Sequence, residues 1–173
     1  RATGKYEKAA IKTYTSLASE VYTPQSGLLR DPSILRARDG DYYVVYTTGW
    51  NGQSFGLAKS RDLRHWEHVR DVQLNLPGLT NAKITNVWAP EWFQDADGNV
   101  SIVVSLSSGG TKGPFSAYLI KANADLSDFS APVAMQGLGG NHIDTFPIRI
   151  GDRYWVITKN ETTKTLERAW AAS

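Results

Sequence analysis

Two aspartates stand where strand-forming segments open, and their carboxylates could act as acid–base groups. Asp31 lies between Arg30 and Pro32, and Asp144 opens a second apolar run. Pro32 fixes its own φ and should hold Asp31 extended, so that the carboxylate points in a set direction at the strand mouth. A third acid, Glu91, follows a proline in a similar opening. Carboxylates crowded at one mouth raise one another's pKa, which lets one stay protonated while another is ionised.

A structural interpretation of the same residues stays open. Each carboxylate could simply cap the backbone of a neighbouring strand. Trp50 and Trp88 lie near strand ends, where a sugar ring could stack on them, but packing is an equally good use of Trp88. The elements around these residues therefore decide between the two interpretations.

The surrounding sequence is almost wholly β. Hairpin turns are expected at Asp39-Gly40, Asp97-Gly98 and Gly151-Asp152. Strands are expected over 33–38, 42–47, 55–60 and 69–74, then 88–93, 100–104, 117–121 and 132–135, then 142–148, 154–159 and 166–170. Short strands in groups of four, repeated at roughly 50–60 residues, are typical of propeller blades. We therefore expect an all-β propeller with about three blades here, opening near residues 31, 89 and 144.

The domain organisation follows from this pattern. Residues 1–27 are expected to hold an N-terminal strand, over 10–17, and a lead-in. Residues 28–173 are expected to form an incomplete propeller domain. In a propeller the first strand of each blade lines the central channel, so Asp31 and Asp144 should face one channel with Trp88 between them. Alternation predicts that Ser33 and Glu91 share the inward face, and that Ile34 and Trp92 pack between blades.

Composition excludes several classes of function. The chain has 19 Lys and Arg and 17 Asp and Glu, without a basic run, so nucleic acid and membrane surfaces are unlikely partners by sequence. No cysteine is present, which excludes disulfides and thiolate chemistry. The segment 95–99 has the wrong spacing for a calcium loop, and no metal or cofactor is expected. An opening without methionine is compatible with a trimmed exported protein, either secreted or periplasmic.

Five segments together resemble glycoside hydrolase family 43. They are Arg30-Asp31-Pro32-Ser33-Ile34, Gly40-x-Tyr42-Tyr43, Ser60-x-Asp62-Leu63-x-x-Trp66, Asn86-Val87-Trp88-Ala89-Pro90-Glu91 and Ile143-Asp144. The resemblance implies a fold of the five-bladed β-propeller type, and an inverting hydrolase of arabinofuranosyl or xylosyl linkages in plant polysaccharides. It implies that Asp31 is the general base, that Asp144 modulates the pKa of the acid, and that Trp88 and Ile143 contact the sugar. It leaves open a structural cation in the channel.

One member of the family pattern is missing. The family's general acid is a glutamate that opens the fourth blade, and Glu91, Glu161 and Glu167 lie elsewhere in the pattern. We expect the remaining blades on another chain or segment, and these 173 residues alone to be inactive. Two alternatives remain: a non-catalytic carbohydrate-binding propeller fragment, and a fructosidase of the related five-bladed clan. The second lacks its expected Asn-Asp-Pro within 1–27.

Overall fold

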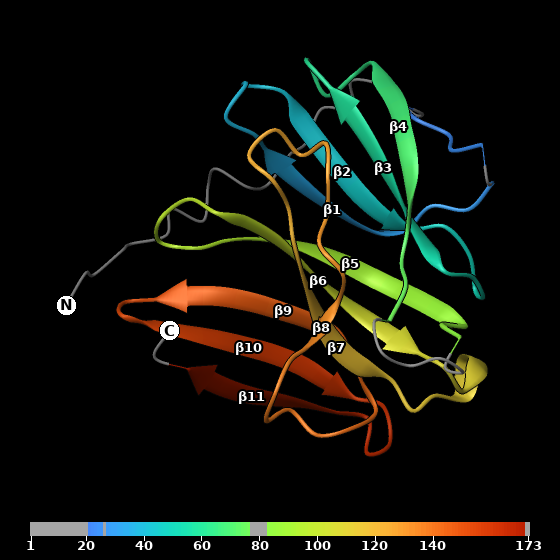
Figure 1. The fold of residues 1–173 in the computed structure, drawn as a ribbon, viewed down its shortest axis with the longest axis vertical. Coiled ribbons are helices and arrows are strands. Elements are labelled where there is room, and N and C mark those ends of the chain that lie inside the picture. The colour runs from blue at the N-terminus through green and yellow to red at the C-terminus, as the bar shows by residue number, and fades with distance from the viewer. Residues whose placement is uncertain (1–20, 26, 77–82, 172–173) are drawn as a thin grey trace, which may run out of the picture.

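The computed structural model describes residues 21–25, 27–76 and 83–171, and these residues form three antiparallel sheets (Figure 1). The first sheet contains β1 (Arg30–Arg36), β2 (Tyr42–Thr47), β3 (Ser54–Ser60) and β4 (Trp66–Gln73). The second contains β5 (Asn86–Gln94), β6 (Val100–Ser107), β7 (Ser116–Lys121) and β8 (Val133–Ala134), with the 3-10 turn η1 (Gly110–Lys112) between β6 and β7. The third contains β9 (His142–Ile150), β10 (Arg153–Asn160) and β11 (Thr165–Ala171).

Neighbouring strands follow one another in the chain, so each sheet is a meander. In the tight turns that join β1 to β2 and β5 to β6, Gly40 and Gly98 have a positive φ of 90° and 81°, which a glycine adopts without steric cost. Asp39 and Asp95 stabilise these turns, because each side chain accepts a hydrogen bond from a backbone N–H two residues on. These local signals are why the strand order was predictable.

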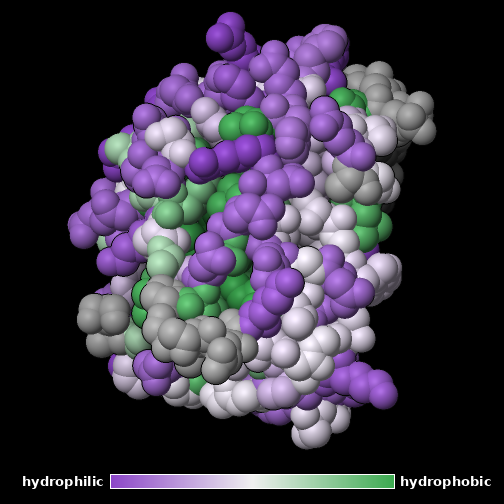
Figure 2. Space-filling model, turned by 45° about the vertical axis from the view of Figure 1, so that its right-hand side comes forward, coloured by the Kyte–Doolittle hydropathy of each residue, from purple (hydrophilic) through white to green (hydrophobic). Residues whose placement is uncertain are grey.

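The second sheet lies between the other two (Figure 1). Its main apolar core joins the first and second sheets through Val45, Phe55, Leu57, Ile102 and Ile120, all fully buried. Trp92 on β5 spans the interface, since its Nε1 donates to the Tyr43 carbonyl of β2 at 3.2 Å. Hydrophilic residues flank a narrow apolar strip on the face seen in Figure 2.

The predicted strands and the all-β partial propeller are confirmed, with boundaries shifted by a few residues. The prediction that Trp92 packs between blades is correct, and Ser33 and Glu91, which were predicted to share the inward face, form a hydrogen bond with each other. The prediction that Ile34 packs between blades is wrong. Its side chain is 54% exposed, because it lies on the face of the first sheet that turns away from the second sheet. The strand expected over 10–17 falls outside the described residues.

The first strand of each sheet carries a bulge. The pairing register shifts after Arg30 in β1, after Trp88 in β5 and after Ile143 in β9. A non-glycine residue within each bulge has a left-handed backbone: φ is 49° at Asp31, 47° at Ala89 and 54° at Asp144. The expectation that Pro32 holds Asp31 extended is therefore wrong, because the bulge sets the backbone there. Such strain is tolerated where the surroundings over-determine it, and it gathers at functional sites.

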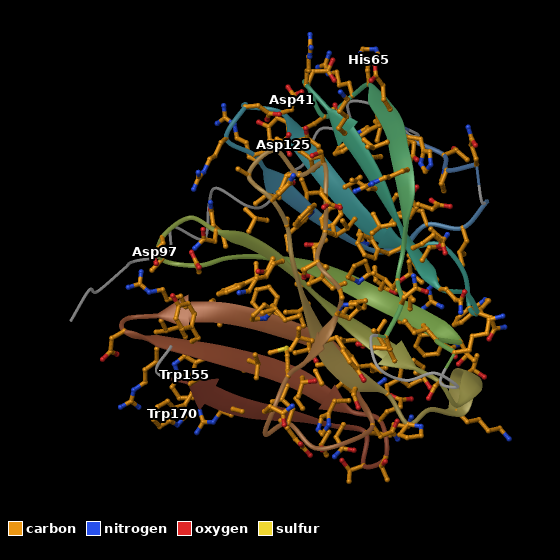
Figure 3. The ribbon with its side chains drawn as sticks, in the orientation of Figure 1. Asp41, His65, Asp97, Asp125, Trp155 and Trp170 are labelled. Carbon is orange, nitrogen blue, oxygen red and sulfur yellow. The ribbon has the colours of Figure 1, made fainter. Side chains whose placement is uncertain are left out.

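The outer face of the third sheet is open within the described part of the chain. Phe146, Ile148 and Ile157 are between 36% and 46% exposed on it, and Trp170 is 53% exposed. Trp155 and Trp170 lie together at one end of this sheet, on β10 and β11 (Figure 3). Large apolar side chains thus gather on this face of the third sheet. No helix among the described residues is long and apolar enough to span a membrane.

Candidate active site

The bulges of the first and third sheets bring Asp31 and Asp144 into one recess. A hollow of about 150 Å³ is lined by both aspartates and by Trp50, Trp88 and Ile143. A second hollow of about 240 Å³ adjoins it, and Asp31 and Asp144 line that one too. Residues more than a hundred positions apart thus share a single cavity, as the blade interpretation predicted. Glu91 lines only the second hollow.

The carboxylate of Asp31 is held by a neutral donor. The Thr47 hydroxyl donates to Asp31 Oδ2 at 3.1 Å, and the Ala89 backbone N–H donates to the same hydroxyl oxygen at 2.9 Å. Thr47 is 3% exposed, so its side chain is largely shielded from water. The contact joins the first-sheet carboxylate to the backbone of the second sheet and fixes the orientation of its side chain.

Asp144 has a different electrostatic setting. Burial raises the pKa of the Asp144 carboxyl, and the negative charge of Asp31 raises it further. The charge of Lys159, on the neighbouring strand β10, opposes this rise in the pKa. Within the described residues no group donates a hydrogen bond to the Asp144 carboxyl. The two aspartates therefore differ in their hydrogen-bond partners, although they occupy equivalent places in their sheets.

Lys159 is itself held by Glu161, whose Oε2 lies 2.9 Å from the Lys159 Nζ. This contact raises the pKa of the Lys159 ammonium. Glu161 also pairs with Lys164, which together with Lys159 keeps the pKa of the Glu161 carboxyl below its ordinary value. Glu161 thus favours the charged form of Lys159, which lies at the recess beside Asp144.

Aromatic side chains form one wall of the recess. Trp88 stacks on the buried Phe115 with ring centroids 4.4 Å apart, and its Nε1 donates to the Trp50 carbonyl at 3.0 Å. Trp50 meets Trp88 edge-on at 6.1 Å and carries the Arg30 guanidinium 4.2 Å from its ring centroid. The packing predicted for Trp88 is therefore present, since one ring face packs on Phe115, and the side chain also lines the cavity.

Glu91 takes a different place from the two aspartates. Burial raises the pKa of its carboxyl, while a hydrogen bond with Ser33 opposes that change. The bulge position of the second sheet belongs to Ala89, which has no acidic group. Glu91 therefore lies at the edge of the paired carboxylates and not between them.

Three contributors were missed from sequence: Thr47, Lys159 and Phe115. Thr47 and Lys159 occupy the same register position, opposite the residue that precedes each bulge. Counting along the repeats from each hairpin would have singled them out. Phe115 carried no such signal, because only folding brings it under Trp88.

No metal site emerges from the described residues, among which no three His, Cys, Asp or Glu side chains lie close enough to hold an ion. A larger hollow of about 360 Å³ includes Asp41 and His65, at the end of the first sheet farthest from the third (Figure 3). Its charged groups pair locally, as in the 2.7 Å contact of His65 with Asp62, and none of the predicted site residues lines it.

Comparison with known proteins shows the family of the chain. Residues 25–171 match the family described as glycosyl hydrolases family 43. The chain belongs to this family. Its relatives include an α-L-arabinofuranosidase of Bifidobacterium longum subsp. longum, 28% identical over 168 residues, which covers 79% of this chain and 15% of the relative. An extracellular endo-α-(1→5)-L-arabinanase of Thermotoga petrophila is 30% identical over 123 residues, covering 64% of this chain and 24% of the relative.

Solved structures of the family share the fold. An α-L-arabinofuranosidase of Clostridium thermocellum superposes with a TM-score of 0.64 at 18% identity, over 85% of this chain and 48% of that one. An arabinoxylan arabinofuranohydrolase of Bacillus subtilis gives a TM-score of 0.65 at 14% identity, over 85% of this chain and 34% of that one. The family 43 chain described here thus spans less than half the length of each of these relatives.

Proposed function

We propose that this chain carries the general base of an inverting glycoside hydrolase that acts on arabinofuranosyl or xylosyl linkages of plant polysaccharides. The observation that supports it best is the pair of carboxylates, Asp31 and Asp144, which separate sheets bring to one recess in different electrostatic settings. Glycoside cleavage of this kind needs a general base, and a second carboxylate close by can adjust the pKa of the proton donor.

In the proposed mechanism Asp31 is the general base. It accepts a proton from a water molecule, and the oxygen of that water attacks the anomeric carbon as the glycosidic bond breaks. A carboxylic acid on the opposite face donates its proton to the leaving oxygen. Inversion places the acid about 6.5–9.5 Å from the base, which leaves room for the water. Asp144 contacts neither transferred proton and sets the pKa of the acid through its charge.

Sugar recognition is assigned to the wall of the same recess. The Trp88 ring and the Ile143 side chain present apolar surface to a sugar ring, and Trp50 extends this surface outward, since it is 56% exposed. Glu91 borders the adjoining hollow and accepts hydrogen bonds from sugar hydroxyls there. This division places the reacting bond beside Asp31.

The general acid is proposed to come from outside residues 1–173. The outer face of the third sheet supports this, because its exposed Phe146, Ile148 and Ile157 offer an apolar surface for a further sheet. Residues 28–173 would then be part of one catalytic propeller domain, completed by sheets on another segment or chain. We further propose export from the cell, in keeping with the extracellular relative in Thermotoga petrophila.

The test is hydrolysis of 4-nitrophenyl α-L-arabinofuranoside and β-D-xylopyranoside by the completed propeller, meaning this chain together with the sheets that supply the general acid. We expect turnover, release of the inverted anomer in proton NMR spectra, and a loss of about 10²–10⁴-fold in Asp31→Asn. The 173-residue chain alone should bind arabinose- or xylose-containing oligosaccharides without cleaving them. Retention of configuration, or full turnover by the chain alone, would contradict the proposal. Binding without hydrolysis by the completed protein would favour the carbohydrate-binding alternative.

A further inference from the structure

All three sheets place a polar residue at one repeated position. Opposite the residue that precedes each bulge, the second strand carries Thr47 in the first sheet, Ser105 in the second and Lys159 in the third. The backbone register is the same in each case, so the three side chains occupy equivalent places. The three positions differ in the neighbouring bulge residue, which is Asp31 in the first sheet, Ala89 in the second and Asp144 in the third.

Thr47 is the one whose hydroxyl completes a hydrogen-bonded chain. The Ala89 amide can only donate, so it takes a lone pair of the Thr47 oxygen at 2.9 Å. An ionised carboxylate can only accept, so the Thr47 hydroxyl proton goes to Asp31 Oδ2 at 3.1 Å. Both ends of the chain are thus fixed in direction, and Asp31 Oδ1 has no partner among the described groups.

Ser105 provides the natural comparison. Its Oγ is fully buried and has no hydrogen-bond partner within the described residues. The bulge residue of that sheet is Ala89, which offers no carboxylate. In the third sheet, where the bulge residue is Asp144, the equivalent position holds the charged Lys159. A buried hydroxyl at this position therefore finds an acceptor only beside Asp31.

We propose that Thr47 is a positioning residue for hydrolysis, which holds Asp31 Oδ2 so that Oδ1 faces the attacking water. This inference rests on the proposed function. A general base must lie within hydrogen-bonding distance of the proton that it accepts, and a misplaced carboxylate slows the reaction without weakening substrate binding. The water proton goes to Asp31 Oδ1, and the Thr47 proton stays on its own oxygen throughout.

Strand pairing does not require this hydroxyl. Thr47 is paired through its backbone with Arg30 on one side and Phe55 on the other. Replacement by valine keeps the shape and the β-branched Cβ of the side chain while it removes the donor. The effect of the hydroxyl can therefore be separated from the effect of the strand.

The experiment compares Thr47→Val, Thr47→Ser and Ser105→Ala in the completed propeller, with Thr47→Ala as a second hydroxyl-free variant. We expect Thr47→Val to lower kcat about tenfold with little change in KM, since a tenfold loss corresponds to about 1.4 kcal/mol, the size of one hydrogen bond. Thr47→Ser should restore kcat to within about threefold, and Ser105→Ala should match the parent protein. An unchanged kcat in folded Thr47→Val and Thr47→Ala, or a change in KM alone, would overturn the proposal.

A second readout needs no turnover and uses the 173-residue chain. The carboxyl carbon of Asp31 should change its NMR chemical shift in Thr47→Val, and the Ala89 amide should exchange about tenfold faster with solvent. Thr47→Ser should restore both signals, and Ser105→Ala should alter neither. If the parent protein fails to hydrolyse any glycoside, the proposed function fails, while these signals still decide whether Thr47 holds Asp31. An unchanged Asp31 signal in Thr47→Val would refute the positioning role.

Discussion

Replacing Asp31 by asparagine or by alanine separates its chemical role from its structural one. Both changes remove the carboxylate, so both should abolish general base catalysis. They differ in what they leave for the neighbours of Asp31. Asparagine keeps an oxygen that can accept the Thr47 hydroxyl, whereas alanine leaves that buried hydroxyl without an acceptor.

The expected stabilities follow from two local features. A buried hydroxyl that loses its acceptor costs about 1–3 kcal/mol. The backbone at Asp31 has a φ of 49°, a region that asparagine tolerates and alanine does not, which adds roughly 1 kcal/mol for alanine. Relief of the repulsion with Asp144 is common to both variants and cancels in their difference. Asp31→Ala should therefore be about 2–4 kcal/mol less stable than Asp31→Asn.

Urea unfolding followed by tryptophan fluorescence measures this difference, and arabinoside hydrolysis by the completed propeller measures the chemistry. Both variants should lose about 10²–10⁴-fold in turnover. Asp31→Asn should keep the stability of the parent protein and its affinity for oligosaccharides. Equal stabilities of the two variants would refute the hydrogen-bond argument. Unfolding of both would show that Asp31 is a structural cap, and parent-like turnover by Asp31→Asn would remove it from the chemistry.

Three further outcomes are expected. The pKa of Asp144 is raised in the folded protein, so its favourable contribution to folding stability is full below its ordinary value of 3.8 and is lost as pH rises through the folded pKa. Urea titrations should therefore find Asp144→Asn more stable than the parent protein near pH 7 and equally stable at lower pH. Lys159→Met should raise the pKa of Asp144 further, since Lys159 lowers it, and a carbon NMR titration that shows no upward change would contradict the assigned role. Trp92→Phe should cost about 2 kcal/mol of unfolding free energy, because the Tyr43 carbonyl loses its indole donor and the sheet interface loses volume; a change below about 0.5 kcal/mol would be inconsistent with this.

The sequence by itself determined the strands, the turns and the pairing of Asp31 with Asp144. Hairpin signals such as Asp39-Gly40 are local, because the glycine adopts a positive φ and the aspartate bonds its own turn. The repeat of strand openings then placed both aspartates at one channel, since equivalent strands of a propeller face the same axis. The same logic failed for Ile34, because alternation gives a face but not what covers it.

Only the tertiary structure decided how each carboxylate is held. Pro32 suggested an extended Asp31, but a bulge turned its backbone into the left-handed region. Bulges depend on pairing between strands, and so do the contact of Thr47 with Asp31 and Ala89 and the packing of Phe115 under Trp88. These contacts join residues distant in the chain through hydrogen bonds and ring packing, whose geometry exists only after the sheets have met. The chain order therefore encodes which groups gather at the recess, and the folded sheets set their contacts and their orientation.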